Sequence, residues 1–184
     1  MSDPTPAAAP SGPETPVNVT RLLAEAARAS SVLWVEVDDR PYPLWYVWHD
    51  DGDPRGTGPA AYIVVGEGEQ QLPELPEEVT LILRSKDSGG RLLRLTAATR
   101  TLAPDTPEWD AAVAVLAPAR LNAPPGLEER WRDGCRLVVL TPHGVPLEGP
   151  GEYSRDTHAT VPASTAATTA TWRPWHLGGR TRRR

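Results

Sequence analysis

The 184-residue sequence contains one cysteine, one lysine and no phenylalanine. The single cysteine, Cys135, excludes an internal disulfide and every metal site that needs more than one cysteine. Lys86 is the one lysine, so arginine supplies almost all of the positive charge. The formal net charge is −5. Because a phosphate backbone is bound by surplus Lys and Arg, we do not expect nucleic acid as a partner of the body of the protein.

Long apolar stretches are also missing. No run is long enough to cross a bilayer, so no membrane partner is expected. Residues 1–17 have neither the basic n-region nor the apolar h-region of a secretory signal. We therefore expect a cytoplasmic protein.

Motifs for several kinds of catalysis are absent from the sequence as well. There is no G-x-S-x-G nucleophile elbow, and Gly66-x-Gly68 lacks the later glycine of a dinucleotide-binding loop. The four histidines are not spaced as metal ligands, and the aspartates of residues 50–53 lack the rest of a calcium loop. We predict no metal site and identify no catalytic residue.

With 21 prolines and 15 glycines the sequence has more of both than a compact fold needs, and the stretches rich in these and other small residues at its ends divide the sequence into four parts. Residues 1–16 predict a disordered N-terminal tail, and residues 17–142 predict one domain. Residues 143–170, rich in Pro, Thr and Ala, predict a linker. Residues 171–184 form a Trp/Arg-rich C-terminal segment, whose two tryptophans favour folding back on its own domain or on a partner subunit.

Within the domain, alternating apolar and polar residues predict six antiparallel β strands. Their predicted ranges are residues 32–37, 44–49, 60–65, 79–84, 91–102 and 134–140. Asn18 or Thr20 can cap a leading helix that ends near residues 28–30, and Thr106-Pro107-Glu108 has the capping hydroxyl, first-turn proline and acid of a helix start. The predicted fold class is mainly β with a few helices, α+β.

Three stretches carry a resemblance to a known family: the aromatic second strand at residues 43–48, the strand at residues 61–65 and the strand pair around residues 84–101. Over residues 17–142 they resemble the FMN-binding split barrel of pyridoxamine 5'-phosphate oxidase-like proteins. The resemblance implies a six-stranded antiparallel split β-barrel that forms a homodimer, with flavin sites in clefts between the subunits. It implies FMN as cofactor, with a deazaflavin as second choice, and an oxidoreductase acting on a small-molecule substrate that the sequence does not indicate.

The hairpin at residues 84–91 is the predicted site for the flavin phosphate. It combines three cations, two hydroxyls and a Gly-Gly turn whose amides can approach an anion. Arg94 matches one position of the family's Gln-x-Arg pattern in the fifth strand. The alternative interpretation is a charged turn with no ligand.

Aromatic and amide side chains complete the predicted site. Trp45 or Trp48 can stack on a flavin ring, although such residues also fill cores. Gln70 and Gln71 can donate to the ring oxygens, or they can lie on a loop surface. The predicted cofactor-binding residues are therefore Arg84, Ser85, Lys86, Arg91, Arg94, Trp45, Trp48, Gln70 and Gln71.

The segment after the third strand departs from the family pattern. Relatives that bind flavin have Thr, Ser and Lys or Arg there, whereas residues 65–72 include Glu67 and Glu69. These acids favour the alternative hypothesis, a ligand-binding or structural split-barrel dimer that has lost the flavin. A third hypothesis, binding of nucleic acid or an acidic partner by the Arg-rich residues 180–184, depends on that tail alone.

Overall fold

A computed structural model describes residues 17–50 and 58–155 of the chain. The predicted N-terminal tail, the C-terminal Trp/Arg-rich segment and residues 156–170 of the predicted linker lie outside these residues. The described part contains seven strands and three helices, which confirms the mainly β, α+β class. In chain order the elements are α1 (Val19–Ala29), β1 (Val32–Val37), β2 (Arg40–Trp45), β3 (Val47–His49), β4 (Ala60–Gly66), β5 (Glu78–Arg84), β6 (Arg91–Leu102), α2 (Pro107–Ala119), α3 (Leu127–Gly134) and β7 (Cys135–Glu148).

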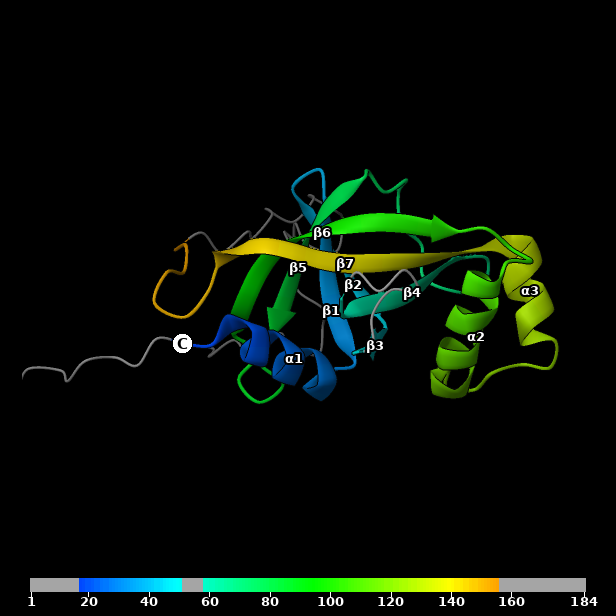
Figure 1. The fold of residues 1–184 in the computed structure, drawn as a ribbon, viewed down its shortest axis with the longest axis horizontal. Helices are drawn as coiled ribbons and strands as arrows, with labels where there is room; N and C mark the ends of the chain where they lie inside the picture. Colours follow the sequence, from blue (N-terminus) through cyan, green and yellow to red (C-terminus); the bar gives the residue numbers. More distant parts are fainter. Residues whose placement is uncertain (1–16, 51–57, 156–184) are drawn as a thin grey trace, which may run out of the picture. The chain divides into compact units, whose positions relative to one another are not determined.

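The strands form one antiparallel sheet in the order β2-β1-β5-β6-β7-β4-β3 (Figure 1). β2 and β3 lie at opposite ends of this order, yet only Tyr46 separates them in the chain. The sheet must therefore curl until its two edges meet at Tyr46. This arrangement fits the predicted split barrel, but with seven strands. The prediction of one strand over residues 44–49 was wrong, because the chain changes from one sheet edge to the other at Tyr46.

The outer edge of β2 is closed to further strand pairing. The side chain of Gln70 bonds both backbone groups of Trp45: its Oε1 accepts from the N–H at 2.5 Å and its Nε2 donates to the carbonyl at 3.0 Å. The backbone N–H and C=O of Trp45 therefore point away from β1. Because these groups alternate in direction along an antiparallel strand, the backbone groups of Pro43 and Pro41 point the same way. Neither proline has an N–H to offer, which is typical of a protected edge.

Two apolar clusters form the core. The first lies inside the curl and includes Leu33, Leu81 and Leu93. The second lies between the other face of β4 and the helices α2 and α3, and includes Trp109 and Trp131. β4 contributes alternate residues to the two clusters, which explains why all of Ala60 to Val65 is buried.

Both long helices begin as predicted. The Asn18 side chain accepts from the Arg21 N–H at 3.0 Å, and the Thr106 hydroxyl accepts from the Trp109 N–H at 3.2 Å. α2 and α3 lie together at one end of the long strands β6 and β7, and α1 lies toward the other end (Figure 1). In this view β3 lies between α1 and α2 (Figure 1).

The last strand is longer than predicted. It continues to Glu148 instead of ending at Leu140, so residues 143–148 belong to the sheet and not to a linker. The 12-residue strand β6 offers partners along this extension, from Ala97 opposite Pro142 to Arg94 opposite Glu148. A short apolar run marked only the half of β7 that also pairs with β4.

Candidate functional site

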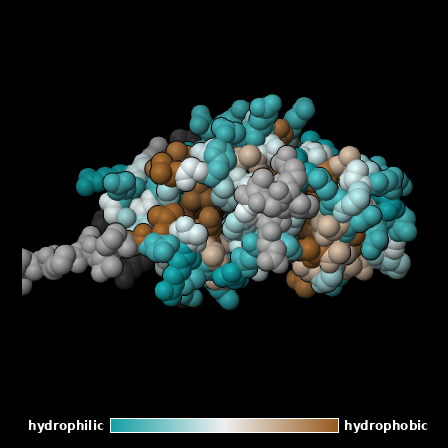
Figure 2. Space-filling view, viewed as in Figure 1, coloured by the Kyte–Doolittle hydropathy of each residue, from teal (hydrophilic) through white to brown (hydrophobic). Residues whose placement is uncertain are grey.

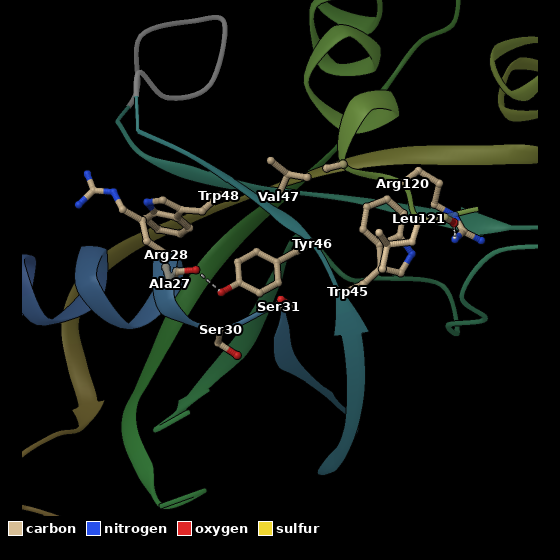
Figure 3. A pocket seen from close by; sticks show the side chains of 11 residues that line it. Ala27, Arg28, Ser30, Ser31, Trp45, Tyr46, Val47, Trp48, Arg120 and Leu121 are labelled. Carbon is tan, nitrogen blue, oxygen red and sulfur yellow. Dashed lines mark hydrogen bonds between the residues drawn. The ribbon is translucent and has the colours of Figure 1, made fainter. Parts of the chain in front are cut away.

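A pocket of about 610 Å³ lies between the C-terminal ends of α1 and α2, along the segment that joins β2 to β3 (Figure 3). This volume is in the range of small-molecule sites. In the view of Figure 2, apolar residues gather beside α1 and beside α2. The lining residues are Ala27, Arg28, Ser30, Ser31, Trp45, Tyr46, Val47, Trp48, Ala119, Arg120 and Leu121.

Tyr46 stands at the middle of the pocket and fixes one wall. Its hydroxyl donates to the Ala27 carbonyl at 2.6 Å, which ties the end of α1 to the point where the chain changes sheet edge. Burial raises the pKa of Tyr46 to about 12. The phenol is therefore a neutral hydrogen-bond donor over the physiological pH range, and no proton transfer is expected of it.

One end of the pocket combines an indole with an ion pair. The Trp48 Nε1 donates to Asp50 Oδ1 at 2.9 Å, and Arg28 Nη2 lies 2.7 Å from Asp50 Oδ2. The hydrogen bond from Arg28 keeps the pKa of Asp50 below its usual value, although burial opposes this. The carboxylate is ionised at neutral pH and offsets the charge of Arg28.

The other end of the pocket also combines a tryptophan with an arginine that is paired with a carboxylate. The Arg120 guanidinium carbon lies 5.7 Å from the centre of the Trp45 ring, and Arg120 Nε lies 3.0 Å from Glu69 Oε2. The side chain of Glu69 is fully buried; its Oε1 accepts from Arg130 Nη2 at 2.5 Å and from Trp131 Nε1 at 3.0 Å. Burial alone would raise the pKa of Glu69, but the hydrogen bonds from Trp131 and Arg130 and the charge of Arg120 lower it overall.

Glu69 is thus a key residue that the sequence interpretation did not identify. In the sequence it is only one of the acids that depart from the family's phosphate-binding pattern. In the structure its charge is neutralised internally, and it joins the β4–β5 connection to α2 and α3. The sequence signal available for this site was an arginine, Arg130, next to an apolar helix position, Trp131. It does not indicate that both residues bind Glu69, because that contact depends on the tertiary structure.

The predicted site residues fall into separate places. Trp45 and Trp48 line the pocket, whereas the five predicted phosphate residues do not. Arg84 lies over the Trp34 ring, 5.6 Å from its centre. The Ser85 hydroxyl accepts from the Ser88 N–H at 3.2 Å, so it stabilises the turn that carries Lys86.

Arg91 and Arg94 bind carboxylates of the sheet. Arg94 lies 2.5 Å from Glu36 Oε1 and 3.6 Å from Glu148 Oε1, and Arg91 lies 3.3 Å from Glu148 Oε2. Both carboxylates are buried. These arginines therefore fasten the end of β7 to β6 and β1.

The two predicted glutamines bind backbone instead of facing the pocket. Gln70 bonds Trp45 and also donates to the Val64 carbonyl at 3.2 Å, so it links the end of β2 to β4. Gln71 donates to the Gly66 carbonyl at 2.6 Å. Gln70 has a structural role at the closure of the sheet, directly behind the pocket wall.

Neither a comparison with known protein families nor one with curated protein sequences finds a match. Among solved structures, the chain is similar to the heme storage protein HutZ of Vibrio cholerae, at 13% sequence identity and a TM-score of 0.46. The similarity covers 72% of this chain and 98% of the other.

Two further properties concern the described residues only. None of their helices is long and apolar enough to span a membrane. No group of three or more His, Cys, Asp or Glu side chains among them is placed to hold a metal ion.

Proposed function

We propose that this protein binds a flat, uncharged ring molecule in the pocket between α1 and α2. The observation that supports this proposal is the pair of indoles at the two ends of a pocket of about 610 Å³, each beside an arginine whose charge a carboxylate offsets. Aromatic walls favour flat ligands by stacking. Paired arginines add N–H donors for ring oxygens without adding net positive charge.

The flavin ring suits these walls better than the flavin phosphate does. A phosphate binds tightly where cations or helix N-termini are directed at it. Here Arg28 and Arg120 already pair with Asp50 and Glu69, and both helices end at the pocket instead of beginning there. The residues described around the pocket therefore do not fit the phosphate of FMN or of a deazaflavin cofactor within one chain.

The proposal differs from both hypotheses drawn from the sequence, because the ligand keeps a flat ring but has no phosphate, and it includes no redox step. Riboflavin, which has the ring but no phosphate, is the first ligand to test. A homodimer, in which a second chain adds residues to the site, stays a prediction. So does an oxidoreductase activity.

Two titrations test the proposal by quenching of ligand fluorescence, one with riboflavin and one with FMN. We expect the two dissociation constants to agree within about threefold, because the phosphate meets no unpaired cation in the described pocket; one charge-assisted hydrogen bond would separate them by about tenfold or more. Nile red serves as an uncharged flat probe that is not a flavin.

Matched tryptophan variants locate the binding. Trp45→Ala and Trp48→Ala should each weaken binding by about tenfold, the usual range for the loss of a stacking partner. Trp34→Ala is the control, since Trp34 lies outside the pocket under Arg84. A strong preference for FMN over riboflavin would contradict the proposal. So would unchanged affinity for all three probes in both the Trp45→Ala and the Trp48→Ala variants.

A further inference from the structure

We propose that an acidic groove on the outer face of β1, β5 and β6 binds the guanidinium or ammonium group of an organic cation. The groove encloses about 380 Å³ and shares no lining residue with the pocket between α1 and α2. It is lined by Glu36, Val37, Asp38, Asp39, Pro76, Glu78, Val79, Thr80 and Thr96. The inference is therefore independent of the proposed ring ligand.

Four carboxylates line this groove, and the cations beside it only partly offset them. Arg94 is shared between Glu36 and Glu148, and His143 Nε2 lies 3.0 Å from Glu78 Oε1. Within the described residues, neither Asp38 nor Asp39 has an ion-pair partner. The groove thus has an excess of negative charge even with both neighbours protonated.

Glu36 gives the groove an unsatisfied acceptor. Its side chain is 7% exposed, and its Oε1 pairs with Arg94 at 2.5 Å. Its Oε2 is buried and has no hydrogen-bond partner among the described residues. A buried carboxylate oxygen without a donor is costly. A ligand N–H entering between Glu36 and the β1–β2 turn would supply that donor.

The β1–β2 turn holds two more carboxylates at the rim. Asp38 and Asp39 both have left-handed backbone angles, with φ of 50° and 59°. Consecutive positive φ values are typical of the type I′ turn, in which Asn-Gly is preferred. Two aspartates in these positions place two negative charges at the rim of the groove. Asparagine tolerates the same angles, so the charges can be removed without disturbing the turn.

The chemistry favours an organic cation over a metal ion. The carboxylates of the groove are not grouped as metal ligands. Instead, the carboxylates share the groove lining with the hydroxyl groups of Thr80 and Thr96, two residues that are paired across β5 and β6. A guanidinium or an ammonium offers several N–H donors to such spread acceptors. The group can belong to a free small molecule or to an arginine or lysine side chain of a peptide.

The test uses the full-length protein and isothermal titration calorimetry at low ionic strength. Agmatine probes for a free cation, a tetra-arginine peptide probes for a protein segment, and butane-1,4-diol is the uncharged control. The first variant is Asp38→Asn with Asp39→Asn, which should weaken binding about tenfold, the effect of losing one charge-assisted hydrogen bond. The matched control, Glu128→Gln with Glu129→Gln, removes the same charge from the exposed start of α3 and should bind as the natural protein does.

Glu36→Gln is the second variant and tests the buried acceptor. It should weaken binding as much as the aspartate variant, and its melting temperature shows whether the fold is kept. Binding of agmatine that is lost in the aspartate variant supports a free cation as ligand, and loss of peptide binding alone supports a protein segment. Absence of binding by both probes, or equal affinity in the aspartate variant and the control variant, would overturn the proposal.

Discussion

Gln70→Ala should destabilise the protein far more than a half-exposed loop glutamine normally would. The side chain makes three hydrogen bonds, two to Trp45 and one to Val64, where the two edges of the sheet meet. Each neutral hydrogen bond contributes about 1 kcal/mol net, so the free energy of unfolding should fall by about 2–3 kcal/mol. For a domain of this size that is a drop in melting temperature of roughly 5–10 °C.

Two companion variants sharpen this prediction. Gln71→Ala removes the neighbouring glutamine, which has one bond, to Gly66, and should cost about 1 kcal/mol or less. Gln70→Glu keeps an acceptor for the Trp45 N–H but directs a carboxylate at two carbonyl oxygens, which raises its pKa in the folded state. The free energy of unfolding of the Gln70→Glu variant should therefore rise, relative to the natural protein, as the pH falls and the carboxyl group is protonated, and it should fall as the pH rises toward 7.

Urea unfolding of the three variants, followed by tryptophan fluorescence and repeated between pH 7 and pH 4.5, measures all of these effects. If Gln70→Ala and Gln71→Ala unfold within about 0.5 kcal/mol of each other, the surface-substitution range, then Gln70 does not close the sheet.

Three other predictions follow from single contacts. Glu69→Gln should cost about 2–4 kcal/mol, since it leaves Arg120 and Arg130 without their buried carboxylate partner. Because the pKa of Glu69 is lowered, this contribution is present at neutral pH and is lost as the pH falls below the ordinary carboxyl range, so the variant should have a flatter acid limb in urea unfolding. Tyr46→Phe should cost about 1–2 kcal/mol, and because the tyrosine pKa is raised to about 12, only the natural protein should lose this stability between pH 10 and about 12. Gly66→Ala should prevent stable folding, with its Cβ in collision with the Gly134 carbonyl, whereas Gly144→Ala, also at positive φ but in open space, should cost only about 1–2 kcal/mol in melting experiments.

The sequence was informative where local pattern and environment agree. Thr106 and the proline after it mark a helix start in any context, and alternation in residues 79–84 and 91–102 marks two strands with one buried face. The change of edge at Tyr46 left no such mark. Residues on both sides alternate as one strand would, and only the pairing partners, β1 before Tyr46 and β4 after it, show that there are two.

The candidate site was predictable in part for the same reason. Trp45 and Trp48 were identified from residue type, because large aromatic side chains have few uses outside cores and binding sites. The predicted cations do not lie with these tryptophans: the cluster at residues 84–91 does not line the pocket, whereas Arg28 and Arg120, which do, come from the ends of two helices far apart in the chain. Charge clusters in sequence do not indicate which carboxylates will face them.

The closure of the sheet and the pocket have one structural origin. Because the chain passes from β2 to β3 within one residue, the side chains from Trp45 to Trp48 cannot follow the pleat of a single strand, and they line a space between two helix ends. Tyr46 binds α1 at that point, and Gln70 holds the strand end behind it. A ligand in the pocket would contact the same segment that joins the two edges. Binding should therefore stabilise the curled sheet against unfolding by an amount that rises with the logarithm of ligand concentration over its dissociation constant. A ligand that binds without raising the melting temperature must bind the unfolded chain equally well, which a pocket formed by the closure of the sheet excludes.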